Sequence, residues 1–204
     1  MIYLIITTSI YNKVGVNDFE HRKNRYIDCI ESVLDFIKND ECIKPIIVEN
    51  NGNRNTYLDD LNCDVVYTNN NELTFDQKAM NELLDIKEVI HKYDIKDDDF
   101  IIKLTGRYKM TDPVFFNTVK ENCHTYDAFV KFYNVSALMY MNDDCVLGLF
   151  AIKCKYLKTF TYVFQKSPEC EFAEFVRTNT KNIIEIRDLY LECCFAGDLS
   201  ILHV

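Results

Sequence analysis

The sequence predicts an α/β fold with a Rossmann-like parallel sheet in its first half, and two observations carry that prediction. Short apolar runs without alternating polar residues, such as Ile2–Thr8 and residues 100–104, are typical of strands buried on both faces, as in parallel sheets. Stretches in which apolar residues recur at helical spacing alternate with these runs. The resulting order of strand, helix, strand, strand, helix and strand, with short connections, predicts a doubly wound sheet.

Each element of the first half has its own local signal. After the first strand, apolar residues between positions 22 and 38 recur at helical spacing. Pro45 precedes a second strand, residues 46–48, which ends at the turn-forming residues 49–53. The remaining elements of this half are a third strand, a second helix and a fourth strand, at residues 64–68, 76–92 and 100–104.

The second half of the chain mixes strands and helices. Apolar segments around polar turns predict strands, and the polar cluster 142–144 is the clearest hairpin-like turn. The expected strands are residues 128–133, 137–141 and 146–153, and the expected helical stretches are 155–164 and 168–178, then 183–186 and 189–195. No internal repeat, proline-rich linker or low-complexity tract interrupts the chain. We therefore expect one domain, residues 1–204.

The charge balance bears on the partners of the protein. The chain has 23 basic and 32 acidic residues and a net charge of -9. A general binder of nucleic acid or of anionic membranes presents a basic face, so we expect neither partner. A local basic pocket for an anion remains compatible with this charge. No run of about 20 apolar residues is present, so no membrane span is expected.

The cysteines and the first residues bear on the compartment. Nine cysteines occur without any CxxC pair, and most lie within apolar runs, which is typical of reduced, buried thiols. They also lack the spacing of zinc ligands. Residues 1–10 are apolar but have no basic segment before them, so they predict a strand and not a signal peptide. We expect a reduced, cytoplasmic protein.

The end of the fourth expected strand carries groups suited to a phosphate. Gly106 lets a backbone approach a ligand closely, and Arg107 offers a fixed fork of hydrogen-bond donors. In open α/β sheets, ligands bind beyond the carboxyl ends of the strands, where the strand order reverses. That point brings Thr7 and Thr8 close to residues 105–107. The sequence therefore predicts a phosphate-bearing ligand at this place.

Several short motifs follow one another along the chain. They are the strand ending in Thr7-Thr8, a helix with Arg22 and Arg25-Tyr26, residues 47–52, Lys78 with Glu82, residues 103–108, residues 148–150, and Glu169 followed by Phe172-Ala173. In this order they resemble nucleotide-sugar glycosyltransferases of the GT-A fold, in particular small viral and bacterial members. The resemblance implies transfer of a sugar from a UDP- or GDP-linked donor to an acceptor hydroxyl on a glycan, protein or lipid. It also implies a nucleotide-binding half, residues 1–110, and an acceptor half, residues 111–204.

One departure from the family bears on metal binding. GT-A enzymes usually carry an Asp-x-Asp motif after the fourth strand, where it binds a divalent metal, Mn or Mg, on the donor diphosphate. Here the sequence Thr-Gly-Arg at residues 105–107 takes that place. Asp97 and Asp99 do form an Asp-x-Asp, but before the strand, at the end away from the ligand. Arg107 and Lys103 can supply the positive charge that a metal otherwise gives, so no metal ligands are assigned.

The resemblance also implies which residues bind the donor. They are Thr7, Thr8, Glu49, Asn50, Lys78, Lys103, Thr105, Gly106 and Arg107. Glu49 and Asn50 either read the base by hydrogen bonds or form an ordinary turn. Lys103 lies inside an apolar strand and needs a partner, so it either reaches the ligand cleft or pairs with an acid of the fold. Arg107 either binds phosphate or pairs with a surface carboxylate, and Lys78 either reaches the diphosphate or lies in solvent.

An inverting transfer needs one carboxylate to deprotonate the acceptor hydroxyl. Glu169 and Glu171 are candidates, with Glu169 the better match to the family, although an acid at the start of a helix also stabilises the helix dipole. Asp144, beside Asp143, either serves the acceptor or catalysis or belongs to a hairpin turn. His203 either binds a metal, as a late histidine does in some GT-A enzymes, or has no special role.

Two other functions are compatible with the sequence. A nucleotidyltransferase of similar fold usually has a glycine-rich, basic loop after the first strand, whereas residues 9–18 contain only Gly15 and Lys13 of that kind. A non-catalytic module that binds nucleotide sugars or glycans is the second alternative, and the missing Asp-x-Asp fits it. Release of free nucleoside diphosphate from a panel of donors separates this module from an enzyme.

Overall fold

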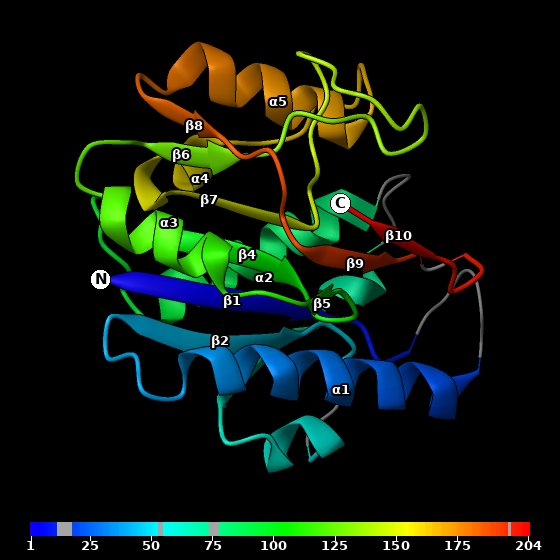
Figure 1. Ribbon diagram of the computed structural model, residues 1–204. Helices are drawn as coiled ribbons and strands as arrows, with labels where there is room; N and C mark the ends of the chain where they lie inside the picture. The colour runs from blue at the N-terminus through cyan, green and yellow to red at the C-terminus, as the bar shows by residue number, and fades with distance from the viewer. Residues whose placement is uncertain (12–17, 53–54, 74–77, 196) are drawn as a thin grey trace.

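The computed structural model describes residues 1–11, 18–52, 55–73, 78–195 and 197–204. At its centre is a seven-stranded sheet with the order β3-β2-β1-β4-β7-β6-β8 (Figure 1). The strands are β1 (Ile2–Thr8), β2 (Ile43–Glu49), β3 (Asp64–Tyr67), β4 (Phe100–Thr105), β6 (Ala128–Val130), β7 (Leu149–Lys153) and β8 (Ile183–Glu185). All neighbours are parallel except those of β7, which is antiparallel to both β4 and β6.

Helices cover both faces of this sheet. They are α1 (Phe19–Ile37), α2 (Lys78–Lys92), α3 (Val114–Asn122), α4 (Cys154–Thr159) and α5 (Pro168–Asn179), with short 3-10 helices η1 (Tyr57–Asp60) and η2 (Asn70–Glu72). Side chains of α1 and α3 share one core cluster, and those of α2, α4 and α5 share another. β1 serves both clusters because alternate residues point to opposite faces, with Leu4 in the first and Ile5 in the second.

The first half of the chain confirms the predicted order of elements. α1 begins at Phe19 because Asp18 accepts a hydrogen bond from the backbone N–H of His21, at 3.0 Å. β2 begins at Ile43, so Pro45 lies inside the strand and not before it. Pairing with β3 starts only at Ile46, so the missing N–H of the proline breaks no bond on that side. Residues 53, 76 and 77 of the predicted turn and helix lie outside the described residues.

The second half departs from the predictions where pairing is non-local. Residues 183–186 were expected to be helical, but Ile183–Glu185 is strand β8, paired with β6. Residues 137–141 form no strand; they contribute one isolated pairing of Met139 with Asn134. The strands expected at 128–133 and 146–153 are shorter, and α4 ends at Thr159. Helix α3 was not predicted at all.

A second, three-stranded sheet closes the carboxyl end of β4. It joins β5 (Lys109–Met110), β9 (Leu191–Cys194) and β10 (Ile201–His203) in the antiparallel order β10-β9-β5. The expectation of a helix at 189–195 is therefore wrong, because β9 pairs with a strand some eighty positions earlier in the sequence. In Figure 1 this small sheet lies beside the end of β4, next to α1.

Two expectations about the chain concern cysteines and membranes. All nine cysteines are unpaired, and five of them are buried. Burial raises the pKa of the Cys29 thiol to about 12 and that of Cys193 to about 12. No described helix has both the length and the apolar character that a bilayer crossing requires.

Candidate functional site

A cavity of about 290 Å³ lies at the carboxyl ends of β1, β2 and β4. Its charged and polar lining comes from Thr7, Thr8, Ser9, Arg22, Tyr26, Asn50, Asn71, Lys78, Asn81, Glu82, Lys103, Thr105, Arg107, Tyr108 and Glu169. The predicted switch point is confirmed, because β2 and β4 flank β1 on opposite sides and Thr7 pairs with Thr105. Seven of the nine predicted donor residues line this pocket, all except Glu49 and Gly106.

Gly106 serves the packing of strands and not the approach of a ligand. Its backbone N–H donates to the carbonyl oxygen of Thr7 at 2.9 Å. A Cβ at this position would lie 2.9 Å from Cγ2 of Thr8 and 3.1 Å from the Thr7 oxygen. The small residue therefore lets the chain leave β4 close against the end of β1, which sets Thr105 and Arg107 at the pocket wall.

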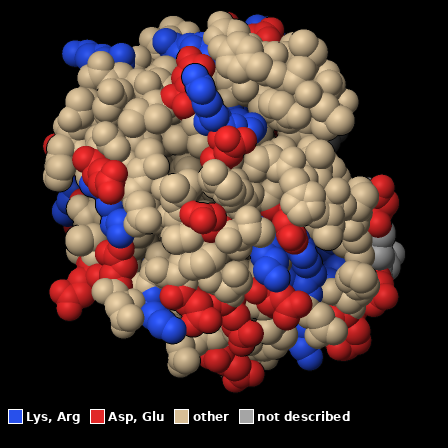
Figure 2. Space-filling model, in the orientation of Figure 1, with Lys and Arg blue, Asp and Glu red and all other residues tan. Residues whose placement is uncertain are grey.

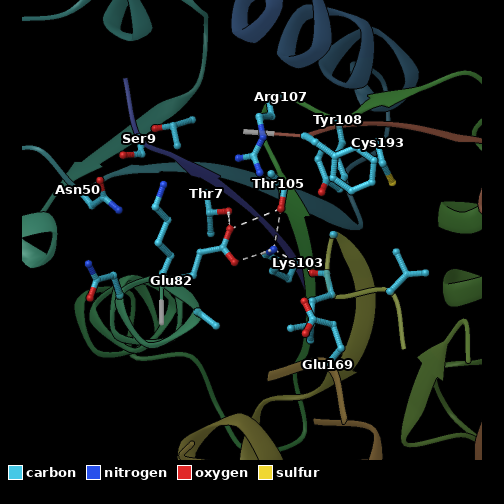
Figure 3. Close-up of a pocket in the computed structure, with 18 of the residues that line it drawn as sticks. Thr7, Ser9, Asn50, Glu82, Lys103, Thr105, Arg107, Tyr108, Glu169 and Cys193 are labelled. Atoms are coloured by element: carbon cyan, nitrogen blue, oxygen red, sulfur yellow. Dashed lines mark hydrogen bonds and ion pairs between the residues drawn. The ribbon is translucent and has the colours of Figure 1, made fainter. Parts of the chain in front are cut away.

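A buried ion pair between Lys103 and Glu82 forms the floor of the pocket (Figure 3). The Nζ of Lys103, which is 2% exposed, lies 3.0 Å from Oε2 of Glu82. It also donates to Oγ1 of Thr105 at 2.7 Å and to the carbonyl oxygen of Leu147 at 2.9 Å. The hydroxyl of Thr7 donates to Oε1 of Glu82 at 2.7 Å. Lys103 therefore lines the pocket and also pairs with an acid of the fold, so its position agrees with both roles predicted for it.

The electrostatics of this pair follow from its surroundings. Burial alone would raise the pKa of Glu82, but the Lys103 ammonium and the Thr7 hydroxyl hold it below its ordinary value. Burial lowers the pKa of Lys103, and the Glu82 carboxylate opposes that shift. The opposite charges of Lys103 and Glu82 thus cancel each other. The other charged residues of the pocket lining are Arg22, Lys78, Arg107 and Glu169.

Arg107 points into the pocket and is held from behind by the small sheet (Figure 3). Its Nε donates to the carbonyl oxygen of Cys194 in β9 at 2.7 Å, and its guanidinium lies 5.2 Å from the ring centre of Tyr108. Arg25 of α1 donates to the Arg107 carbonyl oxygen at 3.0 Å and pairs with Glu192 at 3.3 Å. A backbone carbonyl of β9 therefore holds the side chain of Arg107, the side chain of Arg25 holds its backbone, and no salt bridge joins Arg107 to a carboxylate among the described residues.

Arg22 is a pocket residue that was not assigned from the sequence. It is 4% exposed, and its Nη2 donates to the carbonyl oxygen of Ser9 at 2.8 Å. Its Nε and Nη1 are buried without a hydrogen-bond partner among the described residues. The sequence contains the signal, since Arg22, Tyr26 and Ile30 are spaced at i, i+4 and i+8 on the buried side of α1.

Lys78 opens the described part of α2 and lines the pocket. Burial lowers its pKa, and the neighbouring charges of Arg107 and Arg22 lower it further. Lys78 is thus close enough to both arginines for their charges to act on it. This grouping contrasts with the surface in Figure 2, where acidic and basic side chains are interspersed.

Glu49 lies behind the pocket wall, and of the two roles predicted for it, contact with the base or an ordinary turn, its contacts fit the turn. It is 0% exposed and accepts hydrogen bonds from the Thr8 hydroxyl at 2.6 Å and from the backbone N–H groups of Ile10 and Asn51, each at 3.1 Å. Burial raises its pKa, and these donors oppose the shift. The carboxylate joins the chain after β1 to the chain after β2 and has no place in the pocket lining.

Asn50 does line the pocket, and a buried carboxylate orients it. Its Nδ2 donates to Oδ2 of Asp85 at 3.1 Å, while its Oδ1 is buried without a partner among the described residues. Asp85, on α2, also accepts from Thr68 at 2.6 Å and from Asn70 at 2.7 Å. Burial raises the pKa of Asp85 to about 7. Asn81, one turn earlier on α2, likewise has a buried Oδ1 without a described partner.

Of the three carboxylates predicted as candidates for catalysis, only Glu169 lines the pocket. Glu169 lies in the first turn of α5 and lines the pocket, and no hydrogen bond or ion pair involves its carboxylate within the described residues. Glu171 instead accepts the backbone N–H groups of Val163 at 2.9 Å and Gln165 at 2.6 Å. Although burial acts to raise its pKa, these donors hold it below the ordinary value. Glu171 therefore organises the loop before α5 and is unsuited to the role of base.

Asp144 also lies away from the pocket. It is 6% exposed and accepts from Nδ2 of Asn134 at 2.6 Å, and its carbonyl oxygen accepts from the backbone N–H of Tyr133 at 3.1 Å. These bonds fix the loop between β6 and β7. Its neighbour Cys145 reaches the pocket, whereas Asp144 does not.

The described residues do not fit a divalent metal. Asp97 and Asp99 precede β4 and lie at the end of the strand opposite the pocket, with Asp97 paired to Lys158 at 2.6 Å. His203 is exposed on β10 and is absent from the pocket lining. No group of three His, Cys, Asp or Glu side chains suited to a metal occurs in the described part of the chain. In the pocket, Glu82 is already paired with Lys103.

Comparisons with known proteins support the fold. No protein-family model matches the sequence, and no curated protein matches it. The mannosyltransferase PcManGT from Pyrobaculum calidifontis, solved with GDP-Man and Mn²⁺, is 11% identical with a TM-score of 0.57, and the match covers 92% of this chain and 55% of that one. CMP:2-keto-3-deoxy-manno-octonic acid synthetase in complex with CTP is 12% identical with a TM-score of 0.57, over 91% and 89% of the two chains.

A third similar structure is the bifunctional IspDF from Campylobacter jejuni, at 12% identity and a TM-score of 0.52. The match covers 93% of this chain and 50% of IspDF, so the chain spans about half of that protein. At these identities the likeness establishes the fold alone. The chain shares its α/β fold with these three proteins, which include a mannosyltransferase and a synthetase bound to CTP.

Proposed function

We propose that this protein transfers a sugar from a UDP- or GDP-linked donor to an acceptor hydroxyl on a glycan, protein or lipid. The observation that carries the proposal is the pocket at the switch point, whose lining includes Arg107, Lys103 and Lys78 together with the carboxylate of Glu169. Cations stabilise a departing diphosphate, and a carboxylate can accept a proton from the acceptor. The fold shared with a GDP-mannose-bound mannosyltransferase is consistent with this chemistry.

The donor would lie across the end of β1. Residues 1–110 would form the nucleotide side and residues 111–204 the acceptor side. Asn50 would contact the base through its buried Oδ1, with Thr7, Thr8 and Thr105 forming the polar wall beside it. Gly106 and Glu49 act behind this wall, by close packing and by hydrogen bonds to the chain.

The transfer itself would use a carboxylate for the acceptor and cations for the diphosphate. For an inverting reaction, Glu169 takes the proton from the acceptor hydroxyl while that oxygen forms its bond to the anomeric carbon. The bond from the anomeric carbon to the diphosphate breaks, and the electron pair leaves with the diphosphate. Arg107, Lys103 and Lys78 stabilise the negative charge that develops on this leaving group.

The direct experiment measures which phosphate product is released. A panel of UDP- and GDP-sugars is incubated with the protein and mixed glycan acceptors, and the expected product is free nucleoside diphosphate. The donor should also raise the melting temperature by mass action. No thermal shift with any donor at millimolar concentration, together with no release, would refute the proposal.

A nucleotidyltransferase is the second candidate, because a CTP-bound synthetase shares the fold. That reaction takes a nucleoside triphosphate and releases inorganic pyrophosphate, so assaying pyrophosphate against nucleoside diphosphate in parallel separates the two enzymes. A thermal shift with nucleotide sugars but neither product would instead indicate a binding module.

A further inference from the structure

The charges of the pocket are unbalanced in favour of cations. Arg22, Lys78, Lys103 and Arg107 line it, against Glu82 and Glu169. Lys103 and Glu82 pair at 3.0 Å, and the other charged residues of the lining are Arg22, Lys78, Arg107 and Glu169. The chain as a whole carries a net charge of -9, so this concentration of positive charge runs against its composition. Arg22, Lys78 and Arg107 are called the cation cluster below.

Arg22 is the member whose state most needs an explanation. A buried guanidinium is costly unless a counter-ion and hydrogen-bond acceptors surround it. Arg22 has one such bond, from Nη2 to the Ser9 carbonyl, and lies 5.8 Å from the ring centre of Tyr26. Its Nε and Nη1 have no partner, and no salt bridge joins it to a carboxylate, within the described residues. Because Arg22 lines the pocket, an anion bound there can supply the acceptor that these donors lack.

The rest of the cluster points to the same ligand. The pKa of Lys78 is lowered by burial and by the nearby positive charges of Arg107 and Arg22, so both arginines repel the charged form of this lysine. A multiply charged anion would remove that repulsion, whereas a divalent cation would add to it. Mg and Mn take oxygen ligands, and the described pocket offers only Glu169 as an unpaired carboxylate.

We propose that the cation cluster binds the diphosphate of the donor directly, without a divalent metal, and that Arg22 is the buried anchor of this site. The inference rests on the proposed function for the identity of the anion as a nucleoside diphosphate. Arg22 contributes hydrogen bonds from a side chain that the fold has already immobilised, so little conformational entropy is lost on binding. Lys78 and Arg107 contribute charge at the open side.

Calorimetric titration with inorganic pyrophosphate, UDP and GDP tests the site without requiring turnover. Arg22→Met removes the charge and keeps the length of the side chain, and we expect it to weaken pyrophosphate binding on the order of 10- to 100-fold. Arg22→Lys should recover part of the loss because it restores the charge but not the planar donors. Arg177→Met is the matched control, because Arg177 lies on α5 outside the pocket lining and pairs with Glu185; its affinity should stay within about threefold of the parent.

To test whether binding needs a metal, the same calorimetric titrations are carried out once in EDTA and once in Mn²⁺. We expect dissociation constants that agree within about threefold, whereas a tenfold or greater gain with Mn²⁺ would overturn the proposal. Thermal melting of each variant without ligand checks the fold. If Arg22→Met does not fold, the exposed Lys78→Met carries the test, and unchanged pyrophosphate affinity there would also overturn it.

The outcome is independent of the sugar-transfer assay. Metal-free, Arg22-dependent binding of pyrophosphate without release of nucleoside diphosphate from any donor would uphold this site and refute the proposed function. Sugar transfer that requires Mn²⁺ would uphold the function and refute this site.

Discussion

The two ends of β4 both carry clusters of charged side chains, but they treat those charges differently. Before the strand, Asp97 pairs with Lys158 at 2.6 Å, with side chains 68% and 38% exposed. Near the carboxyl end of the strand, Lys103 is 2% exposed and contacts Glu82, Thr105 and a carbonyl oxygen. Exposed pairs contribute little because water already solvates them, whereas burial makes every missing partner costly. The comparison teaches that the Asp-x-Asp of this sequence lies among exposed ion pairs, whereas the buried groups with unmet hydrogen bonds line the pocket at the other end.

The largest expected effect is the loss of turnover when the Glu169 carboxylate is replaced. Glu169→Gln should lower kcat by roughly 10²- to 10⁴-fold, because the amide cannot take the acceptor proton, while the melting temperature changes little. Steady-state kinetics with saturating donor measure it. Glu171→Gln should show the reverse, a lower melting temperature with kcat preserved, since that carboxylate holds backbone N–H groups. Normal kcat in a folded Glu169→Gln protein would remove Glu169 from the mechanism.

Arg107→Ala should weaken transition-state stabilisation by about 2–4 kcal/mol, roughly a hundredfold or more in kcat/KM for the donor. Arg107→Lys should recover only part, since an ammonium lacks the guanidinium fork. The alanine variant also leaves the Cys194 carbonyl without its donor, so a loss of about 1 kcal/mol of stability should accompany it. Unfolding midpoints separate the two effects, and normal turnover by a folded Arg107→Ala protein would contradict the diphosphate assignment.

Glu82→Gln tests the buried pair itself. It leaves Lys103 buried beside a neutral amide, and since the Glu82 side chain is 32% exposed, we expect a loss of about 1–3 kcal/mol of unfolding free energy. The folded pKa of Glu82 lies below the ordinary 4.5, so the stabilisation is present above that pH and is lost as pH falls through the folded value. Denaturant unfolding should therefore show parent and variant converging in acid.

The double variant Glu82→Gln, Lys103→Met shows how much of the lost unfolding free energy comes from leaving Lys103 buried without a carboxylate partner. Replacing both partners should recover much of the stability that Glu82→Gln loses, because no buried charge remains. If the double variant is no more stable than Glu82→Gln, the loss comes from the hydrogen bonds of Thr7 and Thr105 and not from Lys103.

The smallest effect is expected at the other end of the strand. Asp97→Ala removes an exposed ion pair and should change stability by less than about 1 kcal/mol and leave kcat/KM unchanged. A folded but inactive Asp97→Ala protein beside an active Arg107→Ala protein would show that the diphosphate binds before β4 and not after it.

Local patterns in the sequence predict the first half well because its strands are near-continuous apolar runs joined by short connections. The same kind of pattern would also have assigned Arg22 and Glu82. Each falls on the apolar side of its helix, Arg22 with Tyr26 and Ile30, and Glu82 with Ala79 and Ile86. A charged residue on a buried stripe needs a partner, and Lys103 in an apolar strand was the complementary signal.

Other features depend on information that no local pattern carries. Glu49 lies in a turn-forming segment whose composition does not say which way the carboxylate points, and it points inward to Thr8 and two backbone N–H groups. β8 and β9 are strands because of partners far away in the sequence, and their short apolar runs alone suggested helix. The acceptor for Arg107 is a backbone carbonyl, which every residue possesses, so nothing in the sequence marks Cys194.

The contact between Arg107 and Cys194 has a consequence for how the pocket is made. The two residues are 87 positions apart, so the wall that holds the guanidinium closes only after a long segment of chain has folded between them. During synthesis β1, α2 and β4 are made well before β9. A chain that stops before Leu191 therefore contains every strand of the central sheet but lacks the carbonyl that holds Arg107 at the pocket wall.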